Sequence, residues 1–184
     1  MVDDVSAAYW NPAGLVHLKQ KYQFALMHAA YFAGIANYDY AGLAFRLDDK
    51  QSLGITAIRF GVDGIPNTTQ LIDNQGNINY DRISYFSAAD WAFLLSYARK
   101  LPLEGLSIGM NFKLIHRYIG SFARAWGFGL DAGLQYHIEK WRIGFMARDI
   151  TSTFNAWSYH LSDDMKDVFI ATGNELPENG LELT

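Results

Sequence analysis

Apolar and polar side chains alternate with a period of two along most of this chain. The clearest case runs from Ala125 to Ile138, where odd positions are small or polar and even positions are apolar. The apolar positions are Trp126, Phe128, Leu130, Ala132, Leu134, Tyr136 and Ile138. Successive side chains of a strand point to opposite faces, so this pattern predicts a β-strand with one apolar face.

The same alternation predicts six further strands, which gives about seven in all. They lie at 21–30, 41–47, 51–60, 91–97, 106–114 and 141–148. Three connections are short and charged, at 48–50, 100–105 and 139–140, and the intervening ones, at 31–37, 61–87 and 117–124, are generally longer. Alternate connections of an up-and-down meander lie at the same end. The sequence therefore predicts an antiparallel meander with short turns at one rim and longer loops at the other.

The turn at Glu139 and Lys140 also predicts a register. If these two residues form the tip of a hairpin, positions equally distant from the tip face each other. The predicted pairs are Leu134 with Phe145, Tyr136 with Ile143, His137 with Arg142, and Asp131 with Arg148. The last pair would place the single acid of the 125–138 strand opposite a base.

The N-terminal residues follow another pattern. Asp3 or Asp4 can cap a short helix that reaches Trp10, and Asn11-Pro12-Ala13-Gly14 is expected to end it. On its own, this pattern is typical of a helix that packs against a sheet.

Composition favours membrane strands over membrane helices. Half of the residues are hydrophobic, yet the mean hydropathy is only -0.05 and no run approaches the roughly 18 apolar residues of a membrane helix. Trp126 and Tyr136 lie near the two ends of one apolar face, about 36 Å apart at roughly 3.3 Å per residue. Tilted by about 45°, this face covers about 25 Å, the height of the apolar band of an outer-membrane barrel. We therefore expect an all-β chain that is part of a transmembrane β-barrel in a bacterial outer membrane.

A barrel of this kind assigns the two faces to two environments. The polar residues expected to face the lumen are Arg46, Asn111, Lys113, Asp131, Gln135, His137, Arg142 and Arg148. The residues expected to face lipid are Trp126, Phe128, Leu130, Leu134, Tyr136, Trp141 and Phe145. The polar set could line a conduit, or it could be a mutually satisfied network that holds the barrel and a plug. Inner glycines such as Gly109 and Gly133 could make room for a plug or a ligand, or could let the strands bend.

The sequence offers no catalytic signature. It has no Cys, its five His residues show no HxH or HExxH spacing, and no GxSxG string occurs. The net charge of -4 provides no basic field for nucleic acid. We therefore expect no enzyme activity, no metal and no cofactor.

Three strings resemble one family. Residues 4–15, with Asn11-Pro12-Ala13 near their end, strongly resemble the N-terminal stretch of the PorV/PorQ-like outer-membrane proteins of Bacteroidetes, which share the FadL-like barrel fold. Residues 148–157 resemble the segment after a mid-barrel strand of that family, and residues 173–179 resemble the lead-in to its next strand. The resemblance implies that Asn11, Pro12 and Ala13 are associated with the barrel lumen.

The resemblance also sets expectations for organisation. Family members carry a signal peptide and further strands, so we expect this chain to be a fragment of a longer barrel. It divides into an N-terminal helical segment at 1–20, seven barrel strands at 21–150, and a long loop at 151–184 that leads to a missing next strand.

For function, the resemblance implies a non-enzymatic component or cargo-binding partner of type IX protein secretion. Secretion-system proteins or secreted cargo would bind at the rim loops 61–87 and 151–173. One alternative is a FadL-like transporter that passes hydrophobic small molecules through an apolar pocket and a lateral opening. Another is a soluble lipocalin-like or sandwich protein, in which Trp126, Phe128 and Leu134 would share one packed interior.

Overall fold

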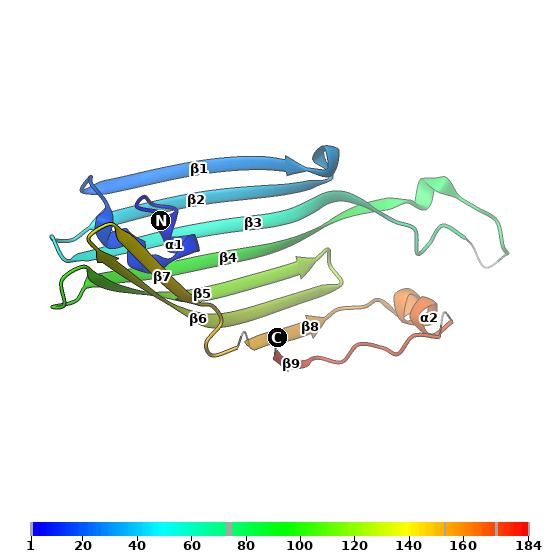
Figure 1. Ribbon diagram of the computed structural model, residues 1–184. Coiled ribbons are helices and arrows are strands. Elements are labelled where there is room, and N and C mark those ends of the chain that lie inside the picture. The colour runs from blue at the N-terminus through cyan, green and yellow to red at the C-terminus, as the bar shows by residue number, and fades with distance from the viewer. Residues whose placement is uncertain (1, 73–74, 153, 172, 184) are drawn as a thin grey trace.

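The computed structural model describes residues 2–72, 75–152, 154–171 and 173–183. Within these residues the chain forms one antiparallel sheet of nine strands, which is not closed into a cylinder (Figure 1). The strands are β1 (Tyr22–Tyr31), β2 (Ala36–Arg46), β3 (Gln51–Asn67), β4 (Ser84–Lys100), β5 (Leu106–Ile119), β6 (Ala123–Ile138), β7 (Trp141–Ala147), β8 (Phe154–Tyr159) and β9 (Gly180–Leu183). Their order is β1-β2-β3-β4-β5-β6-β8-β9, and β7 also pairs with β6.

The seven predicted strands are confirmed as the antiparallel meander β1 to β7, but several are longer than their apolar alternation. Strand β3 continues to Asn67 and β4 begins at Ser84, so these two strands project beyond their neighbours (Figure 1). The predicted loop 61–87 therefore narrows to 68–83. The predicted loop 117–124 narrows to 120–122, which falls within the range of lengths of the turns 47–50, 101–105 and 139–140 at the opposite rim. Its prediction as a longer loop was wrong.

The prediction of one long loop at 151–184 was also wrong. This segment contains β8, the helix α2 (Asp163–Ala171) and β9. Strands β7 and β8 share one edge of β6: β7 pairs with its second half from Ala132, and β8 with its first half up to Phe128. The additional strands were missed because each is only four to six residues long, which is too short for a period to be recognised.

The hairpin register is confirmed for three of the four predicted pairs. Leu134 faces Phe145, Tyr136 faces Ile143, and His137 faces Arg142. The pair of Asp131 with Arg148 was wrong, because the β6–β7 ladder ends where Ala132 faces Ala147. Just beyond, Asp149 has a φ of 53°, which turns the chain out of the strand direction.

The N-terminal residues form two short helices on one face of the sheet, and β7 crosses near them (Figure 1). These helices are α1 (Ala7–Trp10) and the 3₁₀ helix η1 (Pro12–His17). Asn11 ends α1 as predicted, but it also starts η1, because its side chain accepts a hydrogen bond from the backbone N–H of Ala13 at 3.1 Å. Besides α2, the other described helices are the single 3₁₀ turns η2 (Phe32–Gly34) and η3 (Tyr80–Arg82).

The main apolar core lies between the N-terminal helices α1 and η1 and the sheet. Its buried residues are Val5, Ala7, Ala8, Leu15, Val16 and Leu18 from the N-terminal segment, and Ala44 and Ala98 from β2 and β4. No helix among the described residues is long and apolar enough to span a membrane.

Candidate functional site

The two faces of the sheet differ sharply in chemistry. One row of directly paired residues crosses six strands on the outer face: Phe24, Leu43, Ile55, Leu95, Phe112 and Leu130. A neighbouring row crosses the same strands on the inner face: Gln23, Ala44, Gly54, Ser96, Asn111 and Asp131. The outer row is wholly apolar, whereas the inner row is small or polar.

The apolar face of the sheet is exposed and the polar face is buried. In a soluble β-sandwich the apolar face would be the buried one. On β6 the outer Trp126 and Phe128 are 52% and 49% exposed, whereas the inner Asp131 is only 3% exposed. Leu134, Trp141 and Phe145 are also exposed, and Leu130 and Tyr136 are half-buried. Trp126, Phe128 and Leu134 therefore do not share a packed interior, which disagrees with the soluble alternative. An exposed apolar surface this wide is typical of a face that contacts lipid or a protein partner.

Glycines on the inner face let the N-terminal segment lie directly on the strands. A Cβ atom at Gly109 would overlap the backbone of Pro12 and Ala13, and one at Gly133 would overlap the side chain of Asn11. Gly109 lies in β5 and Gly133 is its directly paired neighbour in β6. At these two positions the absence of a side chain makes room for the Asn11-Pro12-Ala13 turn.

Polar side chains then hold that turn in place. The Asn11 amide donates to the carbonyl oxygens of Leu134 and Phe145 at 3.3 and 3.1 Å, and thus joins the N-terminal segment to both strands of the β6–β7 hairpin. The buried Asn111 donates to the carbonyl of Ala8 at 2.8 Å, and the Ser107 hydroxyl donates to that of Ala13 at 3.3 Å.

A second contact involves Arg148. Its guanidinium donates to the carbonyl of Tyr9 at 3.1 Å and lies over the Tyr9 ring, 5.0 Å from the ring centroid. Together with the amide and hydroxyl contacts, this interaction fixes the segment from Tyr9 to Ala13 against β5, β6 and the end of β7. We call residues 2–18 in this position the plug segment.

An ion network lies beside the plug segment. The Lys113 ammonium bridges the carboxylates of Asp131 at 2.9 Å and Asp149 at 2.5 Å. Asp131 also accepts hydrogen bonds from the Asn111 amide at 3.2 Å and from the backbone N–H of Asp149 at 2.9 Å. Lys113 therefore takes the place that the sequence assigned to Arg148, because Lys113 and Asp131 lie on the same face of the adjacent strands β5 and β6.

The structure brings together most of the residues predicted to face inward. Asn11, Pro12, Ala13, Asn111, Lys113, Asp131, Gln135 and Arg148 all belong to the plug segment or to the surface around it. Arg46 and Arg142 do not join this network: Arg46 lies at the end of β2, and the exposed Arg142 lies beside the turn after β6. In the described residues the Arg46 side chain makes no hydrogen bond or ion pair.

Sequence reasoning missed four contributors: Tyr9, Tyr40, Ser107 and Asp149. The Tyr40 hydroxyl donates to the carbonyl of Val5 at 3.3 Å, which ties the start of the plug segment to β2. Ser107 could have been predicted from the sequence, because it alternates in step with Asn111 and Lys113 on β5 and so shares their inward-facing side of the strand. Tyr9 and Asp149 could not have been predicted in this way, since each lies in a segment without alternating polar and apolar residues.

At the opposite rim an apolar crevice of about 490 Å³ lies between α2 and the strand ends. Its aromatic and thioether side chains include Phe86, Phe122, Tyr159, Met165 and Phe169. It is therefore distant from the plug segment and lies where the long connections emerge.

In the part of the chain that the structure describes, no group of three or more potential ligands is placed to hold a metal ion. Comparisons of the chain with protein-family models, with curated proteins and with solved structures find no significant match.

Proposed function

We propose that this chain is part of an outer-membrane β-barrel, with the outer face of the sheet in lipid and the plug segment in the lumen. The observation that carries the proposal is the pair of rows across β1 to β6, apolar on the outer face and small or polar on the inner face. Strands of membrane barrels alternate in this way, because each residue meets either acyl chains or the interior.

Membrane strands must also satisfy their backbone groups. The described sheet is open, with β1 at one edge and β9 at the other. An unpaired edge inside a bilayer leaves N–H and C=O groups without partners, which costs several kcal/mol per group. The proposal therefore includes further strand pairing at both edges in the membrane.

Fluorescence quenching by lipids with brominated acyl chains tests the position of the outer face. Two single-tryptophan variants of the full chain, one keeping Trp126 and one keeping Trp10, are compared in the same vesicles. Trp126 lies on the outer face and Trp10 lies on α1. We expect strong quenching of Trp126 and none of Trp10. Equal quenching of both, or a chain that stays monomeric in buffer without detergent, contradicts the proposal.

For the biological role, we propose a non-enzymatic component or cargo-binding partner of type IX protein secretion. The resemblance of the Asn11-Pro12-Ala13 region to PorV/PorQ-like proteins supports it, as does the projecting β3–β4 hairpin, which offers a rim surface for a partner. Deletion of the gene should stop secretion of type IX cargo while uptake of hydrophobic nutrients continues.

The alternative is transport of hydrophobic small molecules, and the apolar crevice beside α2 favours it. The crevice would receive the molecule at the loop rim before it enters the lumen. The opposite result of the deletion experiment, loss of uptake with normal secretion, would establish this alternative.

A further inference from the structure

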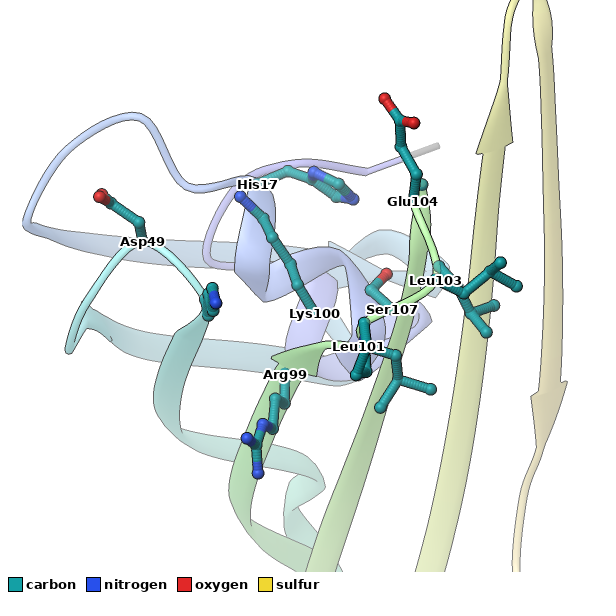
Figure 2. A pocket seen from close by; sticks show the side chains of 12 residues that line it. His17, Asp49, Arg99, Lys100, Leu101, Leu103, Glu104 and Ser107 are labelled. Carbon is teal, nitrogen blue, oxygen red and sulfur yellow. The ribbon is translucent and has the colours of Figure 1, made fainter.

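A cavity of about 520 Å³ opens beside the end of the plug segment, where η1 passes the short turns β2–β3 and β4–β5. Figure 2 shows the Lys100 side chain pointing toward His17, while that of Arg99 points away. Strand alternation explains the difference: Lys100 continues the inner face of Ala98, and Arg99 continues the outer face of Tyr97. The charged and titratable residues that line the cavity are His17, Lys50, Lys100, Arg99, Asp49 and Glu104, and the side chain of Lys100 points toward the imidazole of His17 (Figure 2).

The imidazole of His17 lacks a partner at one nitrogen. Its Nε2 atom is buried and makes no hydrogen bond in the described part of the chain. The ring stacks on that of His137, with centroids 4.5 Å apart and planes 9° apart, so its orientation is fixed. Buried polar groups in folded proteins nearly always have a partner, which points to a group that occupies this place when the cavity is filled.

Lys100 is similarly without a counter-ion. Its ammonium forms no ion pair with any described carboxylate, and the carboxylates of Asp49 and Glu104, which also line the cavity, extend away from it (Figure 2). Burial is the largest cause that lowers the pKa of His17 to about 4, followed by the charges of His137 and Lys100.

Two further charges act on His17: Arg142 also disfavours its protonation, and Asp3 favours it. The field at the imidazole is therefore positive on balance.

We propose that this cavity binds an oxyanion, the carboxylate or phosphate group of a small molecule, between the Nε2–H of His17 and the ammonium of Lys100. Its volume lies within the range of small-molecule sites. Hydrogen bonds to an oxyanion from the Lys100 ammonium and from a protonated His17 ring are charge-assisted and short, and they would give both groups a partner at once. The site is separate from the lipid-facing surface, so the inference does not depend on the membrane proposal.

Nuclear magnetic resonance of the histidine side chains tests the site on the full chain in detergent micelles. The His17 signals are assigned from a His17→Gln variant. An anion bound against the ring favours the protonated form, so titration with inorganic phosphate or with citrate should raise the pKa of His17 from about 4 toward 6.5 in a saturable manner. The phosphate and citrate arms show which oxyanion the site prefers. Sodium chloride at matched ionic strength controls for screening.

Two matched variants locate the binding group. Lys100→Gln should weaken the affinity for the preferred anion about ten-fold, the effect of losing one charge-assisted hydrogen bond. Arg99 also lines the cavity, but its side chain points away from His17 (Figure 2), so Arg99→Gln removes an equal charge without removing a ligand and should change the affinity much less. The inference is overturned if chloride produces the same change as phosphate and citrate. An equal loss of affinity in the two variants also overturns it, because the effect would then be one of net charge.

Discussion

At the scale of single residues, the plug segment depends on positions where a side chain is missing. Gly109 and Gly133 are not needed for an unusual backbone angle; they are needed because Asn11, Pro12 and Ala13 occupy the space of their Cβ atoms. A β-strand tolerates alanine better than glycine when nothing lies above it. Because the plug segment lies so close to the strands, glycine is favoured over alanine at these two positions.

This reversal gives the first prediction. Gly133→Ala should lower the free energy of unfolding by about 1–3 kcal/mol, because the new methyl group overlaps Asn11 and forces the plug segment to shift. Gly180→Ala is the matched control, since a Cβ atom at Gly180 meets nothing within 4 Å. Urea denaturation followed by circular dichroism measures both. Equal stability of the two variants would mean that the plug segment does not lie on β6.

Lys113 gives a prediction about charge. Lys113→Met leaves the buried carboxylate of Asp131 without its ammonium partner, and removal of one member of a buried pair costs about 3 kcal/mol. Lys166→Met makes the same substitution in an exposed pair with Asp163 on α2 and should change stability little. The denaturation midpoints of the two variants should therefore separate. If they coincide, Asp131 and Lys113 are not buried together.

His17 gives a prediction about pH. Its pKa is about 4 in the folded chain and 6.5 in the unfolded chain, so between these values the unfolded chain binds the additional proton. The contribution of neutral His17 to stability is present above pH 6.5 and is lost as the pH falls toward 4. We expect the denaturation midpoint of the wild type to fall more than that of His17→Gln between pH 7 and pH 4.5. Parallel pH profiles would contradict this prediction.

At the scale of elements, the docking of the plug segment depends on one amide that faces two strands. Asn11 donates to carbonyls of β6 and β7, and its side-chain oxygen caps η1. Asn11→Asp keeps the cap but places a charged acceptor against two carbonyl oxygens. It should destabilise the chain by about 2–3 kcal/mol, more than the roughly 1 kcal/mol expected of Asn11→Ala.

Asn79 provides the control for this substitution. It caps η3 through an equivalent hydrogen bond from the backbone N–H of Asp81, at 3.0 Å, but it is exposed in the 68–83 loop. Asn79→Asp should therefore have little effect on the denaturation midpoint. A larger effect of Asn11→Ala than of Asn11→Asp would show that the cap, and not the donation to the strands, holds the plug segment.

The elements also show how far the sequence could predict this fold. Strands β1 to β7 and three pairs of the β6–β7 register follow from a period of two and a two-residue tip, both of which are local. The last residues of β3, after Phe60, were not predicted as strand because Asp63, Gly64 and Pro66 interrupt the alternation of apolar positions. The sequence also predicted an N-terminal helix packed on a sheet and inner glycines that could make room for a plug. It could not predict which glycines face Asn11, Pro12 and Ala13, because Gly109 and Gly133 lie about a hundred residues away in the chain.

At the scale of the whole molecule, the proposed orientation makes the two rims face different compartments. In outer-membrane barrels short turns lie on the periplasmic side and long loops outside. The connections at one rim are the turns 47–50, 101–105 and 139–140, and the opposite rim carries 32–35, 68–83, 120–122 and 160–179. The contrast between the rims comes from 68–83 and 160–179, because 32–35 and 120–122 are as short as the turns at the other rim.

The absence of natural cysteine allows a direct test of this orientation, because any introduced cysteine is the single thiol of the chain. Thr69→Cys lies in the 68–83 loop, Lys140→Cys in the β6–β7 turn, and Phe128→Cys on the outer face. In intact cells a membrane-impermeant maleimide should label Thr69→Cys alone. Permeabilisation of the outer membrane should then expose Lys140→Cys.

Phe128→Cys should resist the reagent in both conditions and react only after detergent extraction, because acyl chains exclude the charged maleimide from the outer face. This third variant distinguishes a sheet in lipid from one that merely rests on a membrane surface. If Phe128→Cys reacts in permeabilised cells as fast as Lys140→Cys, the apolar rows of β1 to β6 are covered by something other than lipid, and the barrel proposal fails with them.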